Sequence, residues 1–512
     1  MRCLHRLLLI VPGVVSIWPF NEIGNAPALP IPPAVAEREA DWRGFWLSIW
    51  PFNKFGNALE LPTPPTVAAR EADRTGFWYL FGLIRMSGKS YSDVFCSRSR
   101  DGCSTVEDFP GTNVHIELKF NKVVEELQRT PLREERGEIW RLGDLGYFIF
   151  NDLLWSKDWK TFPIGADFED HRKHRPTADL LMGARSRAWN RHMIRKSAEA
   201  FLESRQNLSK PDFTGWVNCL FHKILLDIDL SDDEASEFEA YNGQSLMVAL
   251  IPRWLVVPLG WFGLLDLQDA RDKRDMWLQK YEHAIDKDKR GIIPRLEGRD
   301  KRFLADLLLT TMTSAGGISV PTVLNICLAV IFAGENSPLP LEERRLTEAN
   351  IEPLVLETIR RYPPVVGFPW WSPDLSRRTV MNLAMSLRDP DAWGADALEF
   401  KLRPLREYHQ PVLGGTKIGV AWAQQGIGPN GLSPDSRGCP GQTLSVVILT
   451  EFLRALRQSL DDWSVTSMPK GGIKITEGPS SASEFTISRG RSNVCTQEAS
   501  ASGKCDMQRN VQ

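Results

Sequence analysis

The apolar positions along the chain recur mainly at the spacing of a helix. Apolar and charged residues alternate at roughly helical intervals in 122–128 and in 178–202, and 303–312 is apolar with few charges, as in a buried helix. Strand signals are sparse and short. The pattern therefore predicts a mainly α fold with a minor β component.

Another helix is predicted near the C-terminal end, after the loop SRGCPGQ at 436–442. Apolar residues recur at nearly helical spacing from Leu444 to Leu456, which indicates a long buried helix. Cys439 then lies just ahead of the helix N-terminus, where unpaired N–H groups create a positive field. Such a field stabilises a thiolate, so Cys439 is a candidate nucleophile or metal ligand.

The neighbours of Cys439 fit this interpretation. Pro440 suits the first helical position, because its missing N–H costs nothing there. Gly441 lets another body approach the backbone closely, and Arg437 adds positive charge to the loop. The loop therefore predicts a thiolate beneath a large partner, with an ordinary core cysteine as the alternative.

Two apolar segments bear on membrane contact. Residues 1–15 contain two arginines and a short apolar run, typical of a signal-peptide core, a shallow anchor or a stray leader. Leu246–Leu267 is nearly all apolar over 22 residues, the length of a transmembrane helix. However, Arg253 would cost about 2.5–3.5 kcal/mol at the bilayer centre, and Pro252 and Pro258 would break the helix. We therefore expect a buried or membrane-dipping segment.

The chain divides into four parts. After the leader, residues 16–46 recur as 48–78, at an offset of 32 residues. Two copies are too few for a solenoid, and their Pro-rich centres suggest stiff linkers. The chain reads as globular over 79–487, and 488–512 is predicted to be disordered because it is rich in Ser, Gly and charge.

Composition excludes several classes of protein. Of the 512 residues, 42% are hydrophobic and 25% charged, as in a globular protein with a large core. A net charge of −2 provides no overall basic field for nucleic acid. The eight cysteines are scattered without a CxxC pair, which argues against a disulfide scaffold and a structural zinc site. Only Cys96 and Cys103 are close enough in sequence to suggest a bridge.

An ordered set of motifs precedes the Cys439 loop. Glu357 and Arg360 are three residues apart and share one helix face. Pro363 and Pro364 end that helix, and the segment SLRDPDAWGADALEF follows at 386–400. A Glu-x-x-Arg pair alone is usually a solvated ion pair, so the order of the motifs carries the information.

This order resembles the cytochrome P450 superfamily, strongly over about 300–460 and more weakly over 79–300. In that family a Glu-x-x-Arg helix, a meander and a Cys loop follow one another, and the Cys thiolate ligates haem iron. The resemblance implies haem b as cofactor and Cys439 as the iron ligand. The matching residues are Glu357, Arg360, Arg388, Asp389, Pro390, Trp393, Phe400, Arg437, Cys439 and Gly441.

The resemblance alone implies the remaining site residues. Some would line the distal side of the haem, some would contact the haem or its propionates, and one arginine would join the Glu-x-x-Arg pair. In that order these residues are Ala315, Gly316 and Ser319; His171, Arg175, Arg437 and Gly441; and Arg403, with Arg406 as the other candidate.

The chain also departs from the family pattern. Leu432 and Asp435 stand where the Cys loop usually has Phe and Gly. Ile318 and Ser319 replace an acid and a threonine that usually help to deliver protons to bound oxygen. The stretch from Trp371 to Met381 is short, so a β-hairpin usual in the family is expected to be missing.

A branch of the family tolerates several of these changes. Allene oxide synthases and hydroperoxide lyases have a Gly-Gly-hydrophobic stretch, similar to 316–318, and a longer Cys loop, similar to the segment before Cys439. These enzymes rearrange fatty acid hydroperoxides, so they need neither a reductase nor a proton relay.

The resemblance thus implies a haem-thiolate oxidoreductase. The first expectation is monooxygenation of a small lipophilic substrate, with an electron-donor reductase as partner. Hydroperoxide rearrangement in lipid metabolism is the alternative, and a haem-binding protein without turnover is the second alternative. The apolar segments permit peripheral attachment to a membrane, such as that of the endoplasmic reticulum or a plastid.

Overall fold

The computed structural model describes most of the chain between residues 114 and 490. The described residues all belong to one compact unit, which comprises Glu71–Val256 and Leu267–Gln512. The predicted leader and repeat lie outside them. The described ranges are 114–135, 168–183, 186, 189–250, 267–288, 301–365, 367–371, 378–424, 427–428, 431–432, 436, 438–475 and 482–490.

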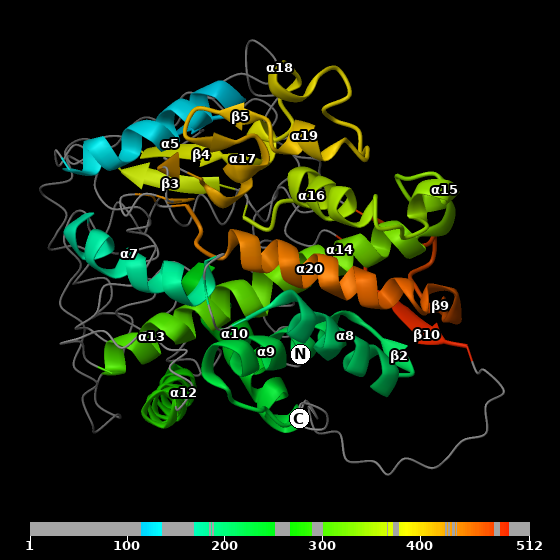
Figure 1. The fold of residues 1–512 in the computed structure, drawn as a ribbon, viewed down its shortest axis with the longest axis horizontal. Helices are drawn as coiled ribbons and strands as arrows, with labels where there is room; N and C mark the ends of the chain where they lie inside the picture. The colour runs from blue at the N-terminus through cyan, green and yellow to red at the C-terminus, as the bar shows by residue number, and fades with distance from the viewer. Residues whose placement is uncertain are drawn as a thin grey trace, which may run out of the picture. The chain divides into compact units, whose positions relative to one another are not determined.

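Long helices make up most of the described chain (Figure 1). Their dominance over short strands confirms the predicted mainly α fold. They are α5 (Phe120–Glu135), α7 (Phe168–Met182), α8 (Arg191–Ser204), α9 (Lys210–Leu226), α10 (Asp232–Leu250), α12 (Leu267–Lys287), α13 (Lys301–Thr311), α14 (Val320–Phe332), α16 (Ile351–Arg361) and α20 (Gln442–Arg457).

Short helical elements connect the long ones. The four-residue helices are α15 (Leu341–Arg344), α17 (Leu383–Ser386), α18 (Pro390–Trp393) and α19 (Leu405–Tyr408). The 3₁₀ turns are η6 (Gly334–Asn336), η7 (Ile418–Trp422) and η8 (Leu460–Asp462), whereas η5 (Met312–Ser319) is a π-helix between α13 and α14.

The predicted helix at 178–202 is two helices in the structure. Helix α7 ends at Met182, and α8 begins at Arg191. The side chain of Asn190 accepts a hydrogen bond from the backbone N–H of Met193 and so caps the start of α8. Periodicity alone missed this cap, because the apolar pattern continues on both sides of it.

The strands are short and form two small sheets and two hairpins. In the first sheet, β4 (Arg378–Asn382) is parallel to β1 (Val114–Glu117) and antiparallel to β3 (Gly367–Trp371). In the second, β10 (Thr486–Arg489) pairs with β2 (Asn207–Leu208) and β9 (Trp463–Ser467). The hairpins are β5 (Pro411–Val412) with β6 (Gly415–Thr416), and β7 (Ile427–Gly428) with β8 (Gly431–Leu432).

One prediction about strands is corrected and another stays a prediction. The hairpin expected to be missing would fall between the end of β3 at Trp371 and the start of β4 at Arg378, and residues 372–377 lie outside the described residues. Ser488 and Arg489 belong to β10, so the predicted disordered tail begins too early. Residues 491–512 lie outside the described residues.

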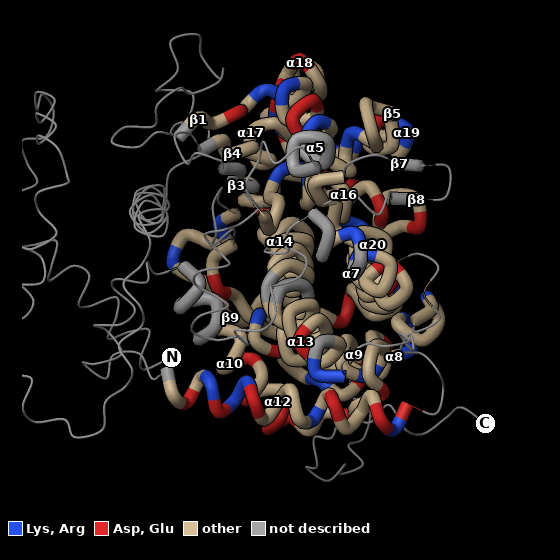
Figure 2. Tube along the Cα trace, turned by 90° about the vertical axis from the view of Figure 1, so that its left-hand side faces the viewer, with Lys and Arg blue, Asp and Glu red and all other residues tan. Residues whose placement is uncertain are grey.

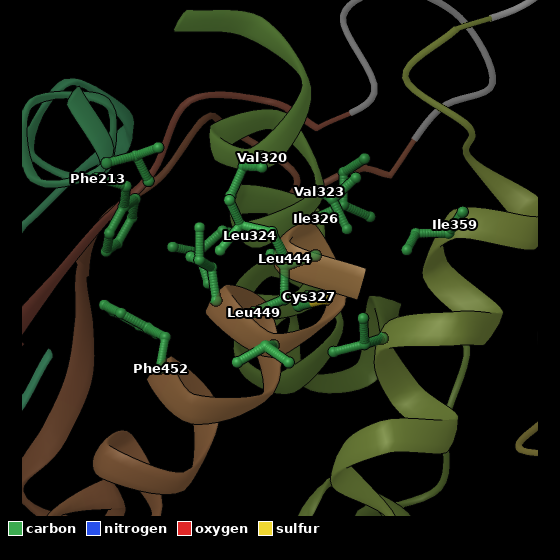
Figure 3. Close-up of a cluster of buried hydrophobic side chains, with 14 of the residues drawn as sticks. Phe213, Val320, Val323, Leu324, Ile326, Cys327, Ile359, Leu444, Leu449 and Phe452 are labelled. Atoms are coloured by element: carbon green, nitrogen blue, oxygen red, sulfur yellow. The ribbon is translucent and has the colours of Figure 1, made fainter. Parts of the chain in front are cut away.

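The core lies where α8, α9, α14 and α20 pack together. Helix α20 contacts α8, α14 and α16, and α14 contacts α9. Apolar side chains from these helices meet in the close-up of Figure 3, where Leu324 of α14 lies beside Leu444 of α20. Phe452 packs edge-on against Phe213, with ring centroids 6.0 Å apart.

Charged residues are distributed unevenly among the helices. Lysines, arginines and acidic residues of both signs run along α12, whereas α14 carries none (Figure 2). Residues 251–266, which form most of the predicted membrane-dipping segment, lie outside the described residues. Among the helices that are described, none has the length and hydropathy needed to cross a bilayer.

The cysteines are dispersed, as their spacing predicts. Cys327 and Cys439 are free thiols. Cys219 is disulfide-bonded. The suggested bridge between Cys96 and Cys103 also falls outside the described residues.

Candidate functional site

The Cys439 loop lies directly before α20, as predicted. The backbone N–H of Cys439 donates a 2.8 Å hydrogen bond to the carbonyl of Trp422, which ties the loop to η7. Gly441 is the N-cap of α20, and a side chain added there would lie 3.7 Å from the Cys439 sulfur. The loop therefore has a fixed backbone beside a helix N-terminus.

The Cys439 side chain is exposed although its surroundings are buried. Gly438 and Pro440 on either side are both buried. Burial is nevertheless the largest influence on the thiol and raises its pKa. The Cys439 side chain is therefore accessible although it lies between buried residues.

The ionisation of Cys439 depends on whether a metal cation is bound beside it. The backbone N–H of Gly441 and the guanidinium of Arg175 both lower the pKa of Cys439, but burial outweighs them. The net pKa is above the ordinary value for a thiol, so the proton stays on the sulfur. A bound metal cation would displace that proton, because metal ligation requires a thiolate.

Arg175 connects α7 to the Cys439 loop. Its side chain is fully buried, and Nη1 donates to the carbonyls of Ser436, at 2.7 Å, and Gly438. Nε pairs with Asp179 at 2.9 Å. Nη2 is buried without a hydrogen-bond partner, and such a group favours an anionic acceptor.

Two other residues were expected at the haem, His171 and Arg437. His171 is buried one turn before Arg175 on α7, at the i and i+4 spacing that puts both on one face. Arg437 lies outside the described residues. The structure therefore brings Arg175 to the loop directly and places His171 next to it along the helix.

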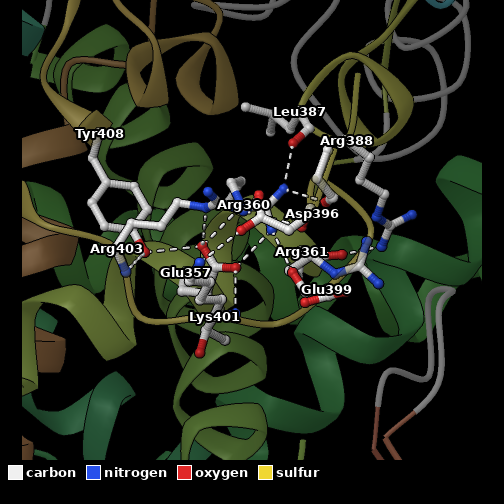
Figure 4. Close-up of polar contacts among 12 residues, drawn as sticks. Glu357, Arg360, Arg361, Leu387, Arg388, Asp396, Glu399, Lys401, Arg403 and Tyr408 are labelled. Carbon is white, nitrogen blue, oxygen red and sulfur yellow. Dashed lines mark hydrogen bonds and ion pairs between the residues drawn. The ribbon is translucent and has the colours of Figure 1, made fainter. Parts of the chain in front are cut away.

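Glu357 and Arg360 form a fully buried ion pair, with neither side chain exposed. Arg360 donates to both carboxylate oxygens, with Nε at 2.8 Å and Nη2 at 2.6 Å (Figure 4). Arg360 also donates to three backbone carbonyls in the segment after α16, those of Leu387, Ala397 and Glu399. This pair therefore fixes α16 to the segment that leads toward the Cys439 loop.

The third arginine is Arg403 rather than Arg406. Arg403 is 5% exposed, its Nε lies 4.0 Å from Glu357, and Nη2 pairs with Asp396 at 2.8 Å. Arg406 is exposed on α19. The resemblance had left these two candidates open.

Sequence reasoning missed Tyr408. Its hydroxyl donates a 2.9 Å hydrogen bond to Glu357 and accepts one from the backbone N–H of Arg403. Burial raises the pKa of Tyr408, so the hydroxyl keeps the proton that it donates. The only sequence signal that could have indicated Tyr408 is its position shortly after Arg403.

The central helix carries the residues expected on the distal side. Ala315, Gly316 and Ser319 all lie in η5. However, the side of Gly316 that would bear a side chain is turned to α9, with Asn218 Oδ1 3.3 Å and Phe221 Cδ2 3.5 Å away. Gly316 therefore packs against a neighbouring helix, which its expected role did not include.

The donor set fits haem better than a bare metal ion. The described residues contain no group of three His, Cys, Asp or Glu side chains that could hold a metal ion. Cys439 is instead a single exposed thiol, so the other ligands would have to come from a cofactor. The unpartnered Nη2 of buried Arg175 adds a site for an anionic group.

Comparison with known proteins identifies the fold. No protein-family model and no curated protein matches the sequence. The structure resembles the open form of cytochrome P450 EryK from S. erythraea, with a TM-score of 0.53 and 14% identity over 81% of this chain and 96% of that chain. A cytochrome P450 enzyme from Bacillus subtilis gives 0.53 and 14%, over 76% and 96%.

A further similar structure is P450BioI in complex with an acyl carrier protein ligated with hexadec-9Z-enoic acid. Its TM-score is 0.52, with 13% identity over 82% of this chain and 99% of that chain. At these identities the likeness concerns architecture. The chain therefore has the cytochrome P450 fold.

Proposed function

We propose that this protein binds haem b with Cys439 as the iron ligand and oxidises a small lipophilic substrate by monooxygenation. The observation that carries the proposal is the exposed Cys439 sulfur between the buried residues Gly438 and Pro440, directly before α20. The cytochrome P450 fold supports it independently.

The residues around Cys439 would hold the cofactor in distinct ways. Arg175 fixes the loop through two carbonyls, and its free Nη2 is available to a haem propionate. Gly441 keeps the space beside the sulfur open to a flat ring. Haem bound there would supply a redox-active iron, to which a thiolate donates the electron density that favours O–O cleavage.

The Glu357 network would maintain this geometry from a distance. Arg360 and Tyr408 hold the segment between α16 and the Cys439 loop against α16 itself. Loops that are anchored by buried, fully bonded polar groups keep a site in position without touching substrate. Glu357, Arg360 and Arg403 are therefore positioning residues.

The expected partners follow from the reaction. Monooxygenation requires electrons, so we expect an electron-donor reductase. A lipophilic substrate is supported by the fatty-acyl carrier protein bound to one structural neighbour. Peripheral membrane contact remains a prediction, because most of the two apolar segments lie outside the described residues.

The test is the carbon monoxide difference spectrum of the reduced, haem-loaded protein. We expect the strongly red-shifted Soret band of a haem-thiolate protein, and its loss in Cys439→Ser. Cys327→Ser is the matched control, because Cys327 is buried in the core, bonds to Thr358, and has its pKa raised by burial to about 12. An unchanged spectrum in Cys439→Ser would refute the assignment.

Hydroperoxide rearrangement is the second candidate. It is favoured by η5, where Ile318 and Ser319 leave no acid at the position expected for one. Rapid consumption of a fatty acid hydroperoxide without NADPH or reductase would favour rearrangement. Product formation that depends on NADPH, reductase and oxygen would favour monooxygenation. A haem spectrum without either activity would indicate a binding protein.

A further inference from the structure

The short helical element η7 makes the backbone contact to Cys439. The Cys439 N–H donates to the carbonyl of Trp422, the last residue of η7, at 2.8 Å. Gly438 packs against the residues that follow, because a side chain added at Gly438 would lie 3.1 Å from Gln424 Cα and 3.2 Å from the Ala423 carbonyl oxygen. The position of Cys439 therefore depends on where η7 ends.

The residue that ends η7 has a strained backbone. Ala423 has a φ of 51° and a ψ of 39°, a left-handed conformation that residues with a β-carbon rarely adopt. Among the described residues, the other non-glycine residue with a positive φ is Asp227, and aspartate tolerates this conformation better than alanine. Ala423 is also buried. Strain of this kind persists where the surrounding structure imposes it, and it is concentrated at functional sites.

The side chain of Gln424 imposes this turn. Its Oε1 accepts a 3.3 Å hydrogen bond from the Thr416 N–H in β6, and its own backbone N–H donates to the Gly419 carbonyl at 3.1 Å. Gly415 and Gly419 leave the space for this side chain, since a β-carbon at either position would collide with Gln424 Oε1. The chain after Ala423 is therefore closed back onto the start of η7.

The other end of η7 is held by a tryptophan between two cations. Lys417, the N-cap of η7, places Nζ 5.3 Å from the centre of the Trp393 ring, and Arg360 Cζ lies 5.2 Å from the same centre. Trp393 is buried in α18, and its ring lies 6.0 Å from that of Tyr408. Cation–aromatic contacts are stronger when they are withdrawn from water. The Glu357 network therefore contacts η7 through Trp393.

We propose that η7 positions Cys439 for the haem iron. Its positioning residues are Lys417 and Trp393 at one end and Ala423 at the other. A ligand atom has to be held within about 0.5 Å of its productive position, which requires supporting residues behind it. Arg175 supports the loop from α7, and η7 supports it at the backbone of Cys439 itself. The role in iron ligation rests on the proposed function, whereas the support of the Cys439 backbone does not.

The support of the Cys439 backbone is tested on the full-length protein without haem. Amide hydrogen exchange reports the bond from the Cys439 N–H to the Trp422 carbonyl. Lys417→Met removes the charge and keeps the length of the side chain, so exchange at Cys439 should accelerate about fivefold, the factor that corresponds to one cation–aromatic contact. Lys417→Arg should restore slow exchange. Lys122→Met is the matched control, because Lys122 is exposed on α5 and pairs with Glu125 at 3.1 Å.

Ala423→Gly separates positioning from stability. Glycine adopts the left-handed conformation without steric cost, so this variant should raise the melting temperature of the protein. The same variant should accelerate exchange at Cys439 by about two- to fivefold, because glycine gives the turn after Trp422 more backbone freedom. A residue that only stabilises the fold would not change these two measurements in this way. A raised melting temperature with slower exchange would therefore contradict the role of Ala423.

The role in iron ligation is tested on the reduced, haem-loaded protein under carbon monoxide. In a low concentration of urea, the red-shifted Soret band should decay about fivefold faster in Lys417→Met than in the unsubstituted protein or in Lys417→Arg. Unchanged exchange and unchanged decay in Lys417→Met would overturn the proposal, and faster exchange with unchanged decay would remove the role in ligation. Absence of the band in the unsubstituted protein would instead refute the proposed function, and hydrogen exchange at Cys439 would still decide whether η7 supports the loop.

Discussion

The Tyr408 hydroxyl offers a direct test of the buried network at Glu357. In Tyr408→Phe the ring keeps its place, 6.0 Å from the ring of Trp393, and only the hydroxyl is lost. Two hydrogen bonds go with it: the one donated to Glu357 and the one accepted from the Arg403 N–H. The substitution therefore isolates polar contacts from packing.

The expected loss is about 2.5 kcal/mol of unfolding free energy. A buried hydrogen bond to a charged group contributes about 1.5–3 kcal/mol, and a neutral one about 1 kcal/mol. The carboxylate of Glu357 keeps three other donors, two from Arg360 and one from the Lys401 N–H. The contribution of the Tyr408–Glu357 hydrogen bond is therefore expected near the lower end of its range.

The assay is equilibrium unfolding in urea, followed by the fluorescence of the chain's 18 tryptophans. Tyr281→Phe is the matched control, because Tyr281 is equally buried and its hydroxyl bonds to the neutral ring of His222. We expect that control to lose only about 1 kcal/mol. If Tyr408→Phe loses no more than Tyr281→Phe, the charge of Glu357 adds nothing to the network and the reasoning is wrong.

Three further predictions concern other parts of the structure. Gly317→Ala should destabilise the protein, because its Cβ would overlap Asn242, whereas Gly215→Ala in the open part of α9 should stabilise it by up to about 1 kcal/mol in thermal unfolding. Arg175→Gln should release haem faster in a transfer assay, since the Cys439 loop loses its anchor; an unchanged rate would contradict this. Burial raises the pKa of Asp306 to about 6, so the free energy of unfolding should fall as pH rises from about 4 to 6. Asp306→Asn should remove roughly 3 kcal/mol of this fall in urea titrations at the two pH values.

Much of the fold could be predicted because its signals are local. The apolar periodicity of α20 and α13 lies within single segments, and so does the order of motifs from Glu357 to Cys439. The break between α7 and α8 could not be read from the same periodicity. The side chain of Asn190 caps the start of α8, and the apolar pattern does not register a change of that size.

The ionisation of Cys439 is set by effects of opposite sign. The helix N-terminus and Arg175 are visible in the sequence or follow from the resemblance, and both favour the thiolate. The amount of protein that surrounds the sulfur becomes known only with the fold, and its effect is the larger one. A sequence can therefore indicate a candidate ligand atom without giving its charge.

The contacts of η5 show why partners distant in sequence escape prediction. From the sequence, Gly316 was assigned by family position to the distal side of the cofactor, and Gly317 follows it directly. In the structure, the volume they leave free is taken by amides that lie between about 70 and 100 residues earlier in the chain. A glycine in a helix interior costs stability unless something occupies the space it opens. The buried amides of Asn218 and Asn242 occupy that space, so a polar interior beside the central helix follows from the packing itself.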